Sequence, residues 1–253
     1  MLKRTVIALS VALVMIVMAW PRAARAELPQ LAGSVWGGEV DVTQRGALSV
    51  GMGWPSFMLQ YDFHTTGRFG VGLRTDFYYG NPSWGFAYGF GWGFHVPMRI
   101  NVLSRNDWSL AVAIDPGMWM GFGDYWGNGW WGNDWFIFAP RIGAGVIAAV
   151  QPIDALNVFF GMRLYFNILV IDPDGRYDSW ADLAVQILPF AGVELSVHRM
   201  IALFFQLHAG PSVVSRHWCH DWAPDGSCRD RRHDVGVSAN LQFYFGATFY
   251  FGR

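Results

Sequence analysis

The chain has 253 residues, of which 53% are hydrophobic and 15% are charged, and its formal net charge is −1. A nucleic-acid-binding protein favours a clustered basic face, and this charge balance argues against that class of partner. After residue 26, no apolar stretch has the length and purity of a membrane-spanning helix.

The first 26 residues resemble an export signal. Lys3 and Arg4 precede an apolar run, and Ala24-Arg25-Ala26 has the small-x-small form of a cleavage site. We expect Sec-dependent export with cleavage after Ala26. The alternative, a retained anchor, requires an apolar run of roughly 20 residues, and this run is shorter. Four of the 18 basic residues lie in this segment and none of the 19 acidic ones, so the mature chain has 14 basic residues, 19 acidic residues and a charge of −5.

Alternating apolar residues predict β-strands in the first half of the mature chain. A less regular pair of strands is expected between residues 35 and 63, where Pro55 marks either a turn or a bulge. A strand is expected near 69–79. A longer one is expected over 86–102, with aromatic side chains on one face and mainly glycines, His95, Arg99 and Asn101 on the other. Glycines opposite aromatics indicate a crowded, curved inner wall.

The second half gives six further strands, near 108–122, 135–150, 156–170, 181–197, 201–215 and 235–251. The last is the clearest, because its apolar positions alternate without a break from Val235 to Phe251, a period that no helix produces. Connections fall into two sizes, which is typical of the two ends of a membrane barrel. The short ones are Thr65–Arg68, Ser104–Asp107, Gln151–Ala155 and Val197–Met200, and the long ones are 123–134, 171–180 and 216–234.

Residues 27–253 resemble members of the Gram-negative outer-membrane β-barrel superfamily, in the size range of its small barrels. The resemblance rests on the export signal, the period-two strands, the asymmetric connections and the aromatic end Phe249-Tyr250-Phe251, which Gly252 and Arg253 follow. It implies one all-β domain, an antiparallel transmembrane barrel of about ten strands, with eight or twelve as alternatives, and both termini in the periplasm. It also implies outer-membrane lipid, lipopolysaccharide and the barrel-assembly machinery as partners.

The strand phase assigns a set of polar residues to the inner face. Four arginines against three carboxylates are expected to form paired networks that fill the lumen, because buried charges need compensation. Trp119, Tyr165 and Tyr244 occupy further space. The alternative is a solute path, with Arg99, Arg141 and Arg163 favouring anions. The inward set is Arg74, Asp76, His95, Arg99, Asp115, Arg141, Arg163, Gln186, Glu194, Gln206, His208, Asn240 and Gln242.

A membrane-embedded hydrolase would combine His208 or His95 with Asp115. Catalysis also needs a nucleophile within hydrogen-bond reach of the base, and no serine or cysteine stands at a convincing position. No catalytic residue, metal site or cofactor is assigned.

The segment 216–234 is expected to be a polar loop that holds both cysteines. In an oxidising compartment, Cys219 and Cys228 favour a disulfide that closes the loop. The alternative is a zinc site that adds His217 or His220 to the cysteines.

Two other loops have unusual compositions. Loop 123–134 contains Tyr125, Trp126, Trp130 and Trp131, which are expected to form an interfacial aromatic girdle, with recognition of a surface sugar or lipid as the alternative. The acidic segment around 171–182 is interpreted as a solvated turn, because its spacing does not match a calcium-binding EF-hand. The acidic segment contains Asp172, Asp174, Gly175, Asp178 and Asp182.

Three functions therefore compete. The favoured one is a barrel with a narrow, largely filled lumen and a structural or surface-interaction role. The alternatives are a small-solute, anion-favouring channel and a membrane-embedded hydrolase.

Overall fold

The computed structural model describes Trp36 and residues 46–66, 68–79, 89–105, 108–123, 135–172, 180–223 and 228–251. The expected export signal with its cleavage after Ala26, and the aromatic residues Tyr125, Trp126, Trp130 and Trp131, lie outside these residues. The described strands, in chain order, are β1 (Gly46–Trp54), β2 (Ser56–Thr66), β3 (Phe69–Tyr78), β4 (Gly89–His95), β5 (Met98–Arg105), β6 (Trp108–Gly123), β7 (Trp135–Ile153), β8 (Leu156–Asp172), β9 (Trp180–His198), β10 (Ile201–Trp222) and β11 (Cys228–Phe251).

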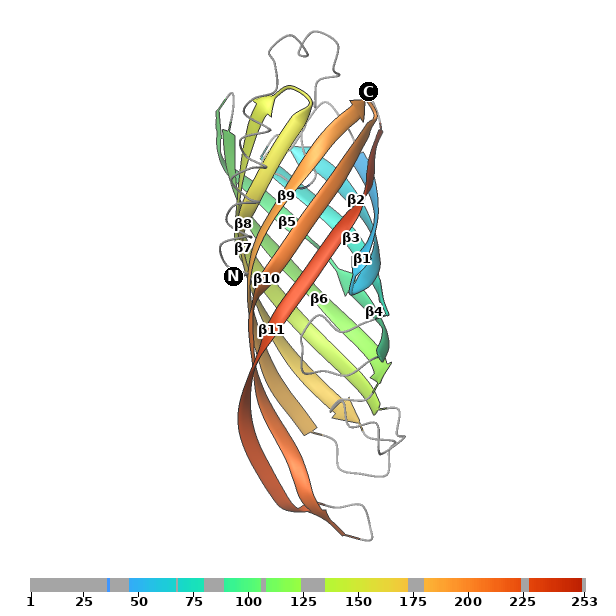
Figure 1. The fold of residues 1–253 in the computed structure, drawn as a ribbon, viewed down its shortest axis with the longest axis vertical. Helices are drawn as coiled ribbons and strands as arrows, with labels where there is room; N and C mark the ends of the chain where they lie inside the picture. Colours follow the sequence, from blue (N-terminus) through green and yellow to red (C-terminus); the bar gives the residue numbers. More distant parts are fainter. Residues whose placement is uncertain are drawn as a thin grey trace, which may run out of the picture.

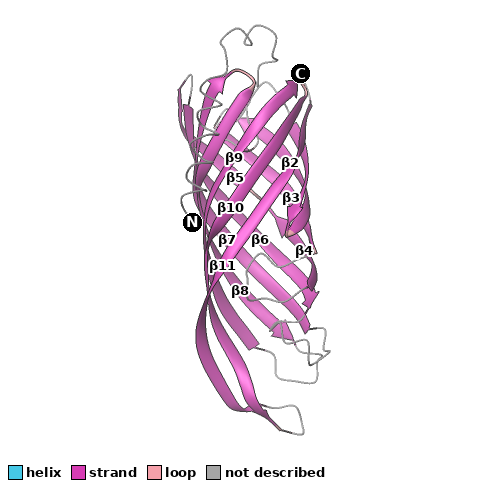
Figure 2. Ribbon diagram, viewed as in Figure 1, coloured by secondary structure: helices cyan, strands magenta, loops and turns pink. Residues whose placement is uncertain are grey.

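These strands form one closed antiparallel barrel (Figure 1). Neighbours in sequence are neighbours in the sheet, and β11 closes the barrel by pairing with β1, from Gly46↔Phe251 to Trp54↔Phe243. The strands are strongly tilted and no helix is drawn in the described part (Figure 2). The all-β, antiparallel prediction is confirmed.

The barrel has ten strand positions, as predicted, because β4 and β5 share one of them. Both pair with β3 and with β6, and the register is the same on either side of the break: His95 lies opposite Arg74 and Gly117, and Met98 lies opposite Val71 and Ile114. The strand expected over 86–102 is thus interrupted at Val96 and Pro97. Pro97 has no N–H to donate, but its carbonyl still accepts from the Gly72 N–H at 2.7 Å.

The connections sort by barrel end. The four predicted short turns join β2 to β3, β5 to β6, β7 to β8 and β9 to β10, all at the end that holds Phe251 (Figure 1). Pro55 is a turn residue and not a bulge: it separates β1 from β2 at the opposite end, after a cis Trp54–Pro55 bond.

The loop predicted over 216–234 is wrong in its extent. β10 continues to Trp222 and β11 begins at Cys228, so most of the segment is a two-stranded ladder that includes Arg216↔Asp234 and His217↔His233. Because β9 pairs with β10 only as far as Ser215, this part projects beyond the barrel wall, where it forms the longest projection in the view (Figure 1). We call residues 216–234 the hairpin arm.

Side chains alternate between the two faces of every strand, as the strand geometry requires. The outer face is apolar and exposed on each strand, for example at Leu73, Ile142 and Val237, which are 56%, 54% and 72% exposed. The inner face is buried and carries polar side chains together with small and aromatic ones. No helix in the described part of the chain is long and apolar enough to span a membrane.

Trp36 is the one described residue that precedes β1, and its side chain lies inside the barrel. It is 4% exposed, and its ring centroid lies 4.8 Å from that of Phe204, an inward side chain of β10. The segment before β1 therefore contributes an aromatic group to the barrel interior.

Candidate functional site

The structure places the whole predicted inward set on the inner face. Asp76 and Glu194 have no exposed surface, and His95, Gln206, His208 and Asn240 are each less than 5% exposed. Arg74, Arg141, Arg163, Gln186 and Gln242 are half-buried. Arg99 and Asp115 are buried as well, at 8% and 6% exposure.

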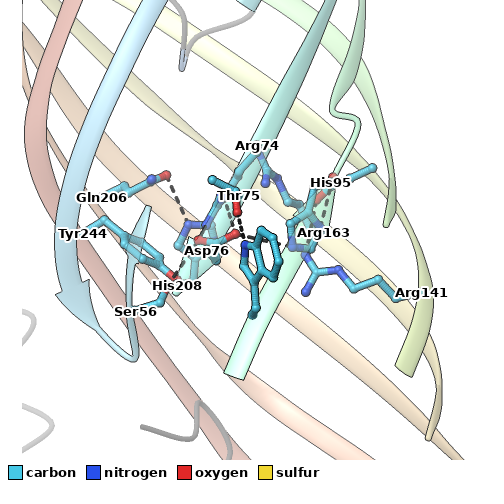
Figure 3. Close-up of polar contacts among 12 residues, drawn as sticks. Ser56, Arg74, Thr75, Asp76, His95, Arg141, Arg163, Gln206, His208 and Tyr244 are labelled. Atoms are coloured by element: carbon cyan, nitrogen blue, oxygen red, sulfur yellow. Dashed lines mark hydrogen bonds and ion pairs between the residues drawn. The ribbon is translucent and has the colours of Figure 1, made fainter. Parts of the chain in front are cut away.

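A chain of polar contacts begins on β3 and crosses β4 to β6 (Figure 3). Arg74 donates two hydrogen bonds to Asp76, of 2.8 Å from Nε and 2.7 Å from Nη2. The imidazole of His95 lies between two carboxylates, 3.4 Å from Asp76 and 3.7 Å from Asp115. Neighbouring strands thus bring together residues that are about 20 positions apart in the sequence.

Asp115 connects this chain to β7 and β8. Arg141 donates to it at 3.4 Å, and the Tyr165 hydroxyl donates to it at 3.0 Å. The Arg141 guanidinium also lies 4.3 Å from the centre of the Tyr165 ring, a cation–π arrangement. The Tyr165 hydroxyl accepts in turn from Arg163 at 3.2 Å. Gly143 leaves the space that this ring occupies, since a Cβ there would lie 2.3 Å from it.

Aromatic contacts continue this chain of contacts through β9 and β10. The Arg163 guanidinium lies 5.2 Å from the centre of the Phe190 ring, which stacks on His208 with 5.3 Å between centroids. His208 is hydrogen-bonded to Gln206 at 3.2 Å and meets the edge of Tyr244 on β11.

Tyr244 connects the chain of contacts back to β2 and β3. Its hydroxyl is 3.1 Å from the Ser56 hydroxyl, which donates to Asp76 at 3.3 Å, and its ring lies 5.3 Å from the Arg74 guanidinium. Contacts therefore run around the whole inner circumference, and Ser56 and Tyr244 meet over β1. We call this ring the belt: Ser56, Arg74, Asp76, His95, Asp115, Arg141, Arg163, Tyr165, Phe190, Gln206, His208 and Tyr244.

A second polar layer lies closer to the end that holds Phe251. Gln60 donates to both oxygens of Asp62, at 3.1 and 2.8 Å. Tyr250 donates to Glu194 at 2.6 Å. Arg99 interacts electrostatically with Asp62 and Glu194, which joins β2, β5 and β9.

The sequence interpretation missed several of these groups. Asp62, 6% exposed, and Asp182, 2% exposed, add two inward carboxylates to the three that strand phase identified. Asp62 was missed because the strand phase around Pro55 was not assigned. Asp182 had been interpreted as part of a solvated loop, but it is a β9 residue opposite Leu169. Trp36 falls in the range 35–63, where two strands were expected, and was missed because inward and outward positions were not assigned there.

A cavity of about 40 Å³ lies between the belt and Trp36. That volume holds only a few water-sized groups, since one buried water needs roughly 10–15 Å³ of cavity volume. The cavity is lined by Trp36, Gln60, Asp62, Gly70, Arg74, Pro97, Met98, Arg99, Ala113, Ile114, Asp115, Ile147 and Arg163.

The belt does not have the arrangement of a hydrolase. A catalytic triad places histidine between the nucleophile and the acid. Here Asp76 lies between Ser56 and His95, and His208 is bonded to Gln206. Among the described residues, no group of three His, Cys, Asp or Glu side chains could hold a metal ion.

The disulfide prediction falls on side chains outside the described residues. The backbone ladder places Cys219 opposite Arg231 and Cys228 opposite Trp222, with register shifts between these pairs. The side chains of the alternative zinc ligands His217 and His220 also lie outside the described residues, as do Asp174, Gly175 and Asp178 of the acidic segment.

No protein-family model matches the chain, and no curated protein is significantly similar to it.

Proposed function

We propose that the mature chain is a Gram-negative outer-membrane β-barrel whose lumen is narrow and largely filled by its own side chains, with a structural or surface-interaction role. The closed barrel with an apolar outer face on every strand carries this proposal. In water, such a surface would greatly exceed the apolar patches that soluble monomers expose. In a bilayer, it faces lipid, and the closed ladder leaves few backbone groups without partners.

The orientation follows from the two ends. Short turns and the C-terminal strand end share one side, which in a bacterial barrel is the periplasmic side. The hairpin arm then projects to the cell exterior, and β6 ends and β7 begins at the same end of the barrel. These extracellular parts are the proposed surface-interaction region, and outer-membrane lipid and lipopolysaccharide surround the wall.

The filled lumen is supported by the belt. A ten-stranded barrel is only slightly wider than the eight-stranded size that side chains can fill, and porin-like aqueous channels use about 16 strands. The inner face carries four arginines and five buried carboxylates, Asp62, Asp76, Asp115, Asp182 and Glu194. This balance favours a paired network that stays in place over a water-filled path.

Membrane fractionation and planar-bilayer recording test the proposal together. The protein should fractionate with outer membranes after export and cleavage following Ala26, and the purified barrel should give no steady conductance. Steady nanosiemens-scale conductance would contradict the filled lumen, and a soluble periplasmic protein would contradict the membrane location.

The anion-favouring channel is the second candidate, and it now depends on fewer arginines. Arg141 is 3.4 Å from Asp115, and Arg99 interacts with two carboxylates. Arg163 is the inward arginine that best fits a cation lining an anion path, because its direct contacts are the Tyr165 hydroxyl and the Phe190 ring. Loss of anion preference in Arg163→Ala would identify it as lining a path if recordings revealed one.

The Cys219–Cys228 disulfide remains part of the proposal for an exported chain. Because their ladder partners differ by three positions, the bond requires the hairpin tip to change register, since bonded cysteines have Cα atoms less than about 7 Å apart. Mass spectrometry of the unreduced protein should show the linked peptide. Two alkylatable thiols would contradict it.

A further inference from the structure

Arg163 differs from the other inward arginines in its partners. In the described part of the chain, no carboxylate lies within ion-pair distance of it, whereas Arg74 and Arg141 each have one at 2.7 and 3.4 Å. Its printed contacts are the Tyr165 hydroxyl and the face of Phe190. Its Nε is fully buried and has no hydrogen-bond partner. Asp115 acts on Arg163 only from beyond ion-pair distance, so the direct contacts of this buried positive charge are one neutral hydroxyl and one ring.

The cavity adjoins this guanidinium. Arg74 and Arg99 line it together with Arg163, so three cations face a volume of about 40 Å³. Its two carboxylates already have donors: Gln60 binds Asp62, and Tyr165 and Arg141 bind Asp115. Trp36 lines another side of the cavity and packs against Phe204.

We propose that this cavity binds a small inorganic anion, with Arg163 as its principal ligand. A bound anion supplies the missing counter-charge, and that compensation is worth most where water is scarce. The volume fits a halide with one or two waters and is too small for a sugar or a nucleotide. The inference depends on the barrel interior alone, so it holds or fails independently of the outer-membrane location.

The test measures thermal unfolding of the detergent-folded full barrel in sodium bromide, chloride, phosphate, sulfate and gluconate at matched ionic strength. Anions that bind the folded state should raise Tm by about 2–4 °C over gluconate at a few-fold excess over Kd. Arg163→Gln should abolish this difference. Arg232→Gln is the matched control, because Arg232 is an exposed arginine of the hairpin arm, half exposed and paired with Asp230 at 3.1 Å.

Crystals grown with bromide give the direct measurement on the unaltered protein. An anomalous peak beside the Arg163 guanidinium would locate the ion, and Arg163→Lys, which retains the charge, should keep a weaker halide response if Arg163→Gln does not fold. A response to phosphate as well as halide would identify the ligand class as small anions in general. Equal Tm in all salts, or the same salt response in Arg163→Gln, would overturn the proposal.

Discussion

At the scale of single residues, the Tyr250 hydroxyl donates a short hydrogen bond of 2.6 Å to Glu194, and both side chains are buried. Tyr250→Phe removes the donor and leaves Glu194 with one fewer in a site that water does not reach. We expect the free energy of unfolding to fall by about 1.5–3 kcal/mol, the range for hydrogen bonds to charged groups. Urea unfolding in lipid vesicles, followed by tryptophan fluorescence, measures it.

Tyr61→Phe is the control for that measurement. Tyr61 packs edge-on against Phe63, and its hydroxyl has no hydrogen-bond partner among the described residues. Tyr61→Phe should change the free energy of unfolding by less than about 0.5 kcal/mol, the usual range for substitutions away from specific contacts. If both variants lost a similar free energy of unfolding, the Tyr250–Glu194 hydrogen bond would not account for the loss.

Gly192 is required because an aromatic side chain lies flat on the inner wall above it. A Cβ at this position would meet the Phe159 ring at 2.3 Å and the Phe205 carbonyl oxygen at 2.5 Å. The ring could turn, but the carbonyl belongs to the β9–β10 ladder and is fixed. Gly192→Ala should therefore cost about 1–3 kcal/mol as an overpacking change.

Ala191→Val tests the neighbouring position, whose side chain faces outward and is exposed. The added methyl groups should be tolerated on that face. If heat-modifiability on gels shows equal loss of folded protein in both variants, the inner-wall explanation is wrong.

At the scale of whole strands, alternation alone predicted most of the barrel, because a period of two is imposed wherever the two faces of a strand meet different surroundings. It identified every strand from Phe69 onward and the four short turns. It failed where that contrast disappears. The hairpin arm lies beyond the barrel wall and encloses no lumen, so Arg216–Trp222 and Cys228–Asp234 show no apolar alternation although they form strands. The break at Pro97 was also missed, since strand phase continues across it.

The hairpin arm should be dispensable for folding. Beyond Ser215, β10 pairs only with β11 in the described part, so the arm adds no contact to the remaining wall. Replacing residues 217–233 by a short turn should leave a heat-modifiable barrel with an unfolding free energy within about 1 kcal/mol of the parent protein.

A single deletion of Leu207 is the contrasting change. Leu207 lies within the wall, opposite Phe243 and Ala191. Removing one residue there shifts the following side chains to the opposite face, and folding should fail. A truncated arm that also prevents folding would show that the arm takes part in assembly.

At the scale of the whole molecule, the inward polar residues could be predicted because strand phase assigns each one to a face. Their pairing could not, because it depends on strand stagger. Asp115 meets His95, Arg141 and Tyr165 only because β4, β7 and β8 reach the same height. The contribution of Trp36 was likewise not predicted, since it lies before β1 and outside the described strands, although two strands were expected between residues 35 and 63.

Besides the second polar layer, two groups of side chains stand between the ends of the barrel. They are the belt and the contact of Trp36 with Phe204, and the cavity lies between them. This arrangement predicts that removing one layer does not create a conducting path. Trp36→Ala should lower the free energy of unfolding by about 3–5 kcal/mol, the usual loss for a large buried aromatic. It should nevertheless leave planar-bilayer recordings silent, because the belt is intact.

Adding Arg74→Ala and Tyr244→Ala to Trp36→Ala should then give resolvable openings, because these two residues connect the belt across β1 and β2, 5.3 Å from guanidinium to ring centre. Trp108→Ala with the same two changes is the matched control: Trp108 is 40% exposed on the outer face, so its loss opens nothing inside. The first triple variant must be heat-modifiable, which shows that it is folded. If it then gives no conductance, groups other than the belt and the Trp36–Phe204 contact close the lumen. Conductance from Trp36→Ala alone would mean that the belt leaves an open path, and that Trp36 is the barrier.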